Sequence, residues 1–236
     1  MARPRKQRVD ASVALQVATP ARHELWVGVA DALRSAILDG SIAAGSSLVE
    51  ADLAERFEVS RGPIRDALRD LAREGLVVDL PRRGSVVSTL SFTDIQEVYE
   101  VREGLEAAAV KLVVARAADQ EIAELADLLG DLEAAWDRGD EYAESLSADL
   151  AFHSRLVSLA GNGRMTATYE QLVGQTRLQA ISAAVVNPSL RLGMKRSAHR
   201  DIVQCLLTRD PLATVAAIER HYAYARERLL IGDVGS

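Results

Sequence analysis

The sequence predicts a mainly α protein in two parts: an N-terminal winged helix-turn-helix followed by an all-α antiparallel bundle of six or seven helices. Three observations lead to this prediction. Closely spaced helical segments with a tight turn come first, a hairpin signal follows, and the rest of the chain has helical periodicity throughout. A length of 236 residues, 48% of them hydrophobic, is enough to bury a core in each part.

The N-terminal elements follow the order of a winged helix-turn-helix. Three segments place apolar residues at helical spacing, and turn signals follow them: 23–39, 50–57 and 61–74. Two β-branched runs, 76–80 and 85–90, then flank the turn Pro81-Arg82-Arg83-Gly84, which is a hairpin signal. We therefore expect a DNA-binding domain over residues 23–90.

The remainder of the chain predicts an all-helical domain over residues 91–231. Its first helix is expected to open on a capping box formed by Thr93 and Gln96. The helical segments, separated by glycine, asparagine and proline breaks, are 93–117, 119–138, 140–160, 163–184, 189–208 and 211–231. Because the connections are short, neighbouring helices should run antiparallel.

Charge is distributed unevenly along the chain. Residues 1–22 hold five basic groups against one acidic group, whereas the whole chain has a net charge of −6. We expect a basic, disordered arm that contributes to DNA binding, or else a solvated terminus with no role. The acidic balance argues against a protein that coats nucleic acid without sequence preference, but a local DNA-reading patch remains compatible with it.

Three features that the sequence lacks narrow the expected location of the protein in the cell. No apolar run approaches the ~20 residues of a membrane helix. The basic N-terminus has no apolar segment of a secretory signal. The single cysteine, Cys205, cannot form an internal disulfide. The sequence therefore predicts a cytoplasmic protein with no membrane association.

The segment 61–74 has the pattern of a DNA-reading helix. Ser60 is placed to cap it, and Pro63 lies in its first turn. On a helical projection, one face carries the apolar side chains, and the adjacent face carries Arg61, Arg65, Arg69 and Arg73. Such a strip suits phosphates and guanine edges in a major groove. The alternative is a solvated surface on which Asp66 and Asp70 pair with these arginines.

Histidines on apolar faces of three predicted helices indicate a metal site. Asp149 and His153 are four residues apart and therefore project from one face of a helix. His199 and His221 lie on apolar stripes of two later helices. Three imidazoles and one carboxylate suit Zn²⁺, Ni²⁺, Mn²⁺ or Fe²⁺. The alternatives are hydrogen-bonded core histidines, or a metal that only clamps the bundle.

Arg102 lies in the middle of an apolar helical stripe. Because an unpaired buried charge costs several kcal/mol, the guanidinium must have a partner. Glu106, one turn later, would make a structural ion pair with it. An anionic ligand is the other candidate partner, because arginine binds carboxylates through two hydrogen bonds.

The N-terminal motifs resemble the GntR family of bacterial transcription regulators. The resemblance rests on LVEADLAERFEVSRGPIRDALRDLAREGLVV and RRGSVV, within residues 23–90. It implies base or phosphate contacts by Arg61 and Arg65, a close backbone approach at Ser60 and Gly62, and a wing that reaches the minor groove at Gly84. Arg69 on the helical strip and Arg83 at the wing tip complete the predicted DNA-binding set.

The helical part resembles the FCD branch of that family, through VYEVREGLEAAAVKLVVARA, ADLAFHSRLVSLAGN, AHRDIVQCLLTRD and IERHYAYARERL. The resemblance implies a homodimer on a palindromic operator, usually a repressor. It also implies a metal, zinc first, on Asp149, His153, His199 and His221. It places Arg102 at a cavity for a small organic acid effector, such as a sugar acid or dicarboxylate. Arg177 and Asn187 are further expected cavity residues. Tyr222 departs from the family's usual leucine.

The competing prediction is a metal-dependent hydrolase or lyase fused to a DNA-binding head, since a metal with an open position activates water. Against it, the sequence places no further carboxylate as a general base and contains no nucleophile motif. We therefore expect a regulator and not an enzyme.

Overall fold

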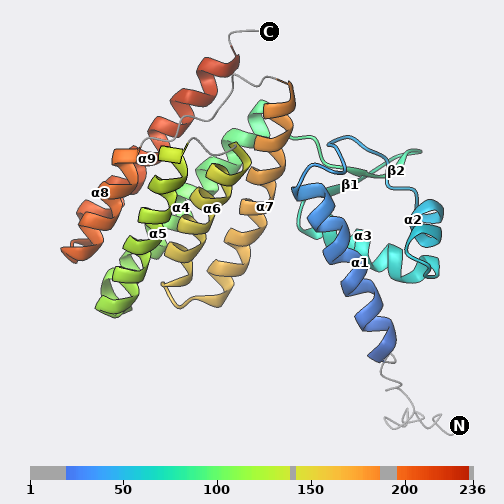
Figure 1. Ribbon diagram of the computed structural model, residues 1–236, viewed down its shortest axis with the longest axis horizontal. Coiled ribbons are helices and arrows are strands. Elements are labelled where there is room, and N and C mark those ends of the chain that lie inside the picture. The colour runs from blue at the N-terminus through green and yellow to red at the C-terminus, as the bar shows by residue number, and fades with distance from the viewer. Residues whose placement is uncertain (1–19, 139–141, 187–195, 234–236) are drawn as a thin grey trace, which may run out of the picture.

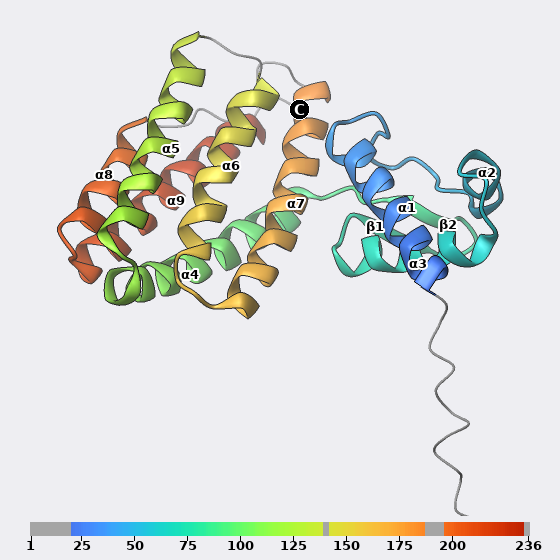
Figure 2. The same cartoon turned by 60° about the horizontal axis from the view of Figure 1, so that its bottom comes forward.

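The computed structural model describes residues 20–138, 142–186 and 196–233. It confirms the predicted fold class. A winged helix-turn-helix lies beside an all-helical bundle, as the two views in Figures 1 and 2 show.

The N-terminal part contains three helices and a two-stranded wing. Its elements are α1 (Pro20–Leu38), α2 (Glu50–Arg56), α3 (Arg61–Arg73), β1 (Val77–Leu80) and β2 (Gly84–Val87). The strands pair antiparallel, with Val77 opposite Val87 and Leu80 opposite Gly84. The chain before α2 adds to the sheet, because the Leu48 N–H donates to the Ser85 carbonyl at 2.8 Å. This extra pairing was not predicted.

Helix α1 begins three residues before the predicted domain start, at Pro20, a residue type favoured at the first helical position. Residues 20–22, assigned to the basic arm on charge, therefore belong to this helix. The helix ends before Gly40, which takes the left-handed conformation (φ +83°) typical of a helix C-terminus. Residues 1–19 of the predicted arm lie outside the described residues.

The second part consists, within the described residues, of α4 (Phe92–Arg116), α5 (Asp119–Arg138), α6 (Tyr142–Ser158), α7 (Gly163–Val186), α8 (Arg196–Leu207) and α9 (Pro211–Asp233). Helix α4 opens on a capping box formed by Ser91 and Asp94, not by Thr93 and Gln96. The Asp94 side chain accepts the Ser91 N–H at 2.7 Å, and Ser91 Oγ accepts the Asp94 N–H at 3.2 Å. The box prediction was wrong because the N-cap is Ser91, two residues before the predicted Thr93. Among the described helices, none is long and apolar enough to cross a membrane.

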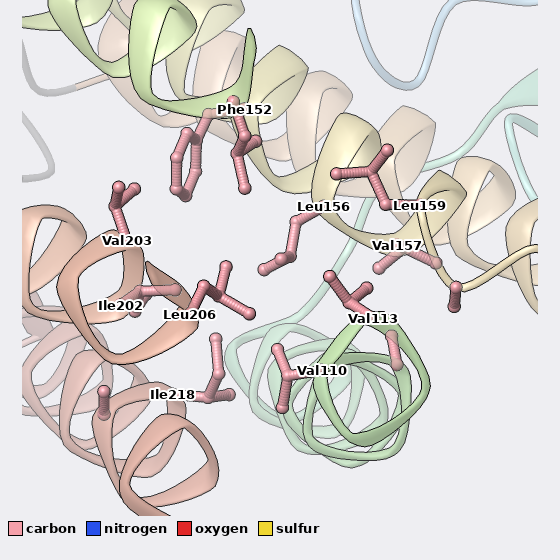
Figure 3. Close-up of a cluster of buried hydrophobic side chains, with 14 of the residues drawn as sticks. Val110, Val113, Phe152, Leu156, Val157, Leu159, Ile202, Val203, Leu206 and Ile218 are labelled. Carbon is pink, nitrogen blue, oxygen red and sulfur yellow. The ribbon is translucent and has the colours of Figure 1, made fainter. Parts of the chain in front are cut away.

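Most of the buried apolar side chains in the described residues belong to two cores, one in each part. In the bundle, side chains from four helices point toward one another, among them Val113 of α4, Leu156 of α6, Ile202 of α8 and Ile218 of α9 (Figure 3). All four are fully buried. The N-terminal core is built from α1, α2, α3 and the wing, and it also includes Leu178 of α7.

Candidate functional site

Helix α3 is anchored by one apolar face. Ile64, Ala67, Leu68 and Leu71 on that face are buried in the N-terminal core. Ser60 occupies the N-cap position with an extended backbone (φ −70°, ψ 163°), but its side chain makes no capping hydrogen bond. The first N–H groups of α3 therefore have no side-chain cap from Ser60, and uncapped N–H groups at a helix N-terminus can bind phosphate.

The adjacent face of α3 carries the predicted arginine strip, and Arg61, Arg65, Arg69 and Arg73 are all exposed. Three of them meet carboxylates. Their closest distances are 2.8 Å for Arg65 to Glu50, 3.4 Å for Arg69 to Asp66, and 3.1 Å for Arg73 to Asp70. The arginines therefore form the surface ion pairs that the alternative interpretation expected. Exposed pairs of this kind contribute only about 0–1 kcal/mol, so a phosphate can replace the carboxylates at little cost.

The wing turns sharply at its tip. Arg82 and Gly84 both have positive φ, +69° and +72°. A Cβ built on Gly84 would meet no atom within 4 Å, so the backbone conformation and not packing favours glycine there. The turn leaves Arg83 exposed at the tip.

The four predicted metal ligands come together inside the bundle. Asp149 and His153 project from α6, His199 from α8 and His221 from α9. One ring nitrogen of each histidine lies within 4.8 Å of the others. His153 Nε2 is 3.2 Å from His199 Nε2, which is 2.9 Å from Asp149 Oδ1. His153 and His199 are fully buried.

These separations fit a shared ion. Two donors about 2.0–2.1 Å from one zinc ion, at a tetrahedral angle, lie roughly 3.3 Å apart. The observed 3.2 and 2.9 Å separations are close to this value. Three imidazoles and one carboxylate also form a donor set that zinc and neighbouring transition metals accept.

Glu106 of α4 fixes the orientation of His153. Its Oε2 lies 2.8 Å from His153 Nδ1, and its Oε1 accepts hydrogen bonds from the hydroxyls of Tyr169 and Tyr222, the latter at 2.5 Å. A carboxylate at Nδ1 favours the tautomer in which Nε2 carries the lone pair, and this Nε2 faces the cluster. The sequence named Glu106 only as a partner for Arg102, because the contact with His153 arises from the packing of α4 against α6.

Arg102 is buried and fully partnered. Its Nη2 donates to Tyr169 Oη at 2.8 Å, its Nη1 donates to Thr176 Oγ1 at 3.4 Å, and Glu106 Oε1 lies 3.8 Å away. The rings of Tyr99, Tyr169 and Tyr222 surround the guanidinium at 5.4–5.6 Å, which is a cation–π arrangement. The predicted Glu106 partner is therefore present, with tyrosines as additional partners.

The charges of this cluster suit a cation. Burial alone would raise the pKa of Glu106, but His153 and Arg102 outweigh it and lower that pKa to about 2. Burial is likewise outweighed at Asp149, where the hydrogen bond with His199 is the largest opposing cause and lowers the pKa of the carboxyl. Burial lowers the pKa of His221 well below its ordinary value. At neutral pH the carboxylates are therefore charged and His221 is neutral, as metal ligation requires.

Arg177, expected at the effector cavity, lies on α7 and points toward the N-terminal part. Its Nε donates to the Leu38 carbonyl at 3.1 Å, so the side chain points toward the end of α1. Helical periodicity alone does not show which neighbour each face of α7 meets, so the contact with α1 was not predicted. Asn187 lies outside the described residues.

An α3 helix with an exposed arginine strip, a wing and an attached helical domain together define a DNA-binding transcription regulator. Residues 26–87 match the model of bacterial regulatory proteins of the gntR family, and residues 97–224 match the FCD domain model. The chain belongs to the GntR family, in its FCD branch.

Individual relatives agree with this assignment. The HTH-type regulator YdhC of Bacillus subtilis is 35% identical over 130 residues, which cover 55% of this chain and 58% of that protein. The match thus spans less than two thirds of that relative. The HTH-type transcriptional repressor RspR of Escherichia coli is 29% identical, covering 80% of this chain and 82% of RspR.

Solved structures show the same fold. A transcriptional regulator GntR from Rhodococcus sp. RHA1 has a TM-score of 0.72 at 27% identity, covering 88% of this chain and 98% of that one. Escherichia coli McbR/YncC has a TM-score of 0.69 at 21% identity, covering 89% and 97%, and supports the fold alone. These relatives are described as regulators, so the prediction of a regulator and not an enzyme is confirmed.

Proposed function

We propose that this chain is a cytoplasmic, homodimeric repressor whose helical domain binds a divalent metal and a small carboxylate effector. The metal, zinc first, would be held by Asp149, His153, His199 and His221. The observation that carries the proposal is the convergence of three imidazoles and one carboxylate from three helices, with Glu106 orienting His153. A bound metal would supply a Lewis-acidic position for a carboxylate oxygen.

Effector binding would regulate DNA binding because the two binding equilibria are thermodynamically coupled. A dimer would place two α3 helices in successive major grooves of a palindromic operator. An effector bound near Arg102 would release DNA only to the extent that it prefers the arrangement that does not bind DNA. Repression is supported by the descriptions of RspR and of the gluconate operon transcriptional repressor of Bacillus subtilis, which is 25% identical over 214 residues.

We expect Arg65→Ala to weaken selective DNA binding strongly. Sheared genomic DNA of the source organism is incubated with purified protein, and bound fragments are sequenced. Wild type should enrich a few palindromic fragments, and Arg65→Ala should bind them about tenfold or more weakly, because a base- or phosphate-contacting arginine is worth about 1–3 kcal/mol. Arg155→Ala is the matched control, since Arg155 also pairs with an exposed carboxylate, Glu124 of the bundle. If Arg65→Ala enriched the same DNA fragments as wild type to the same extent, α3 would not be the helix that reads the DNA sequence.

We expect Arg102→Lys to weaken carboxylate binding while keeping the buried positive charge. A panel of sugar acids and dicarboxylates is tested for thermal stabilisation of the zinc-loaded protein. Acids that stabilise wild type should bind the variant at least about tenfold more weakly, because lysine lacks the planar pair of donors. Arg226→Lys is the control, because Arg226 instead pairs with Glu103 of α4. Unchanged titration of Arg102→Lys would exclude Arg102 from the effector site.

A further inference from the structure

Helix α7 belongs to the bundle but lies against the winged helix-turn-helix in both views (Figures 1 and 2). Two of its side chains reach the ends of N-terminal helices. Gln175 Nε2 donates to the Glu74 carbonyl at 3.0 Å, directly after α3, and Arg177 Nε donates to the Leu38 carbonyl at the end of α1. Carbonyls at a helix C-terminus lack partners within their own helix. The bundle therefore caps both the recognition helix and α1.

The same turn of α7 completes the N-terminal core. Leu178 is only 2% exposed and is buried among the apolar side chains of that core. At Gly75 (φ +75°), which follows α3, an added Cβ would lie 2.2 Å from Gln175 Nε2. Glycine at this position thus leaves room for the end of the Gln175 side chain. The position of the α3 C-terminus depends on α7 through both hydrogen bonding and packing.

The other face of this turn meets the buried arginine. Thr176, between Gln175 and Arg177, accepts from Arg102 Nη1 through its Oγ1 at 3.4 Å. Tyr169, two turns earlier on α7, contacts both Arg102 and Glu106. One helical turn therefore connects Arg102 with the end of the recognition helix.

We propose that the turn from Gln175 to Leu178 positions the recognition helix, and that a change at Arg102 reaches α3 through this turn. The second half of the proposal rests on the proposed effector site. Close-packed interfaces do not deform continuously. A displacement of α7 must therefore either carry the ends of α1 and α3 with it, or break two caps and expose Leu178.

Hydrogen exchange of the full-length protein, without added carboxylate and in the presence of a chelator, tests this. Leu178→Ala should speed amide exchange over residues 61–80 by about thirtyfold or more, the factor expected for truncating a buried leucine. Leu129→Ala, in the bundle core on α5, is the matched control and should leave this segment unchanged. If Leu178→Ala does not fold, Gln175→Ala should give about a fivefold increase, and Gln204→Ala on α8 should give none.

The connection to Arg102 is tested by Thr176→Val, which keeps the shape of the side chain and removes the hydroxyl. It should change exchange over residues 61–80 at least about threefold. The control is Thr168→Val, because both threonines also donate to a carbonyl four residues earlier on α7, but Thr168 is exposed. If Leu178→Ala or Gln175→Ala leaves exchange over residues 61–80 unchanged, this turn of α7 does not position the recognition helix. If Thr176→Val leaves that exchange unchanged, Arg102 is not connected to α3 through this turn. Zinc binding is titrated separately, so its failure would contradict the metal proposal alone.

Discussion

His153→Ala is expected to eliminate high-affinity zinc binding. A zinc site in a small domain contributes about 10–16 kcal/mol of binding free energy, so each of four ligands contributes about 3 kcal/mol, or roughly a hundredfold in affinity. His153 should exceed this share, because it also links the cluster to Glu106. Isothermal titration of metal-stripped protein with Zn²⁺ measures the change.

Thermal unfolding gives an independent measure of the same event. Zinc at about a thousand times its dissociation constant should stabilise wild type by about 4 kcal/mol, a rise of roughly 10 °C for a chain of this size. His153→Ala should lose most of that rise. The matched control is His23→Ala, because His23 belongs to α1 and not to the bundle. Equal zinc affinity in His153→Ala and His23→Ala would contradict the proposed ligand set.

Local patterns predicted most of the fold. The apolar face of residues 61–74, the turn Pro81–Gly84 and the breaks between the later helices each depend on residues near in sequence. The same reasoning placed Asp149 and His153 on one helical face. The convergence of that face with His199 and His221 was also expected, because all lie on apolar stripes that must turn inward.

Contacts between distant elements were harder to predict. Periodicity showed that Arg102 is buried, but not that Tyr169 and Thr176 of α7 meet its guanidinium. It also did not show that Arg177 turns toward α1. Such contacts depend on the rotation of each helix about its axis and on which helix lies beside it. Both are determined by the packing of the whole bundle, which local sequence patterns do not show.

Glu106→Gln is expected to be the most destabilising single change in the buried polar cluster. Glu106 is fully buried, and its carboxylate accepts from two tyrosine hydroxyls and from His153 while lying 3.8 Å from Arg102. The substitution leaves a buried arginine uncompensated and replaces one acceptor oxygen with a donor. Breaking a buried pair in this way costs about 3–5 kcal/mol, measurable as a fall in the free energy of unfolding in urea.

The same substitution should weaken zinc binding about 10–100-fold, because the carboxylate that orients His153 is lost. Glu103→Gln is the matched control. It lies on α4 one turn earlier and pairs with the partly exposed Arg226, so its loss should cost less than about 1 kcal/mol and leave zinc affinity unchanged. A Glu106→Gln variant as stable as Glu103→Gln would contradict the role of Glu106.

A double-mutant cycle separates the two functions of Glu106. Arg102→Met removes the buried positive charge, so adding it to Glu106→Gln should recover part of the lost stability. It should not restore zinc affinity, because the contact between Glu106 and His153 does not involve Arg102 directly. Recovery of stability without recovery of zinc binding would assign Glu106 to both neighbours independently. Recovery of both would mean that the uncompensated charge of Arg102, and not the lost contact with His153, weakens zinc binding in Glu106→Gln.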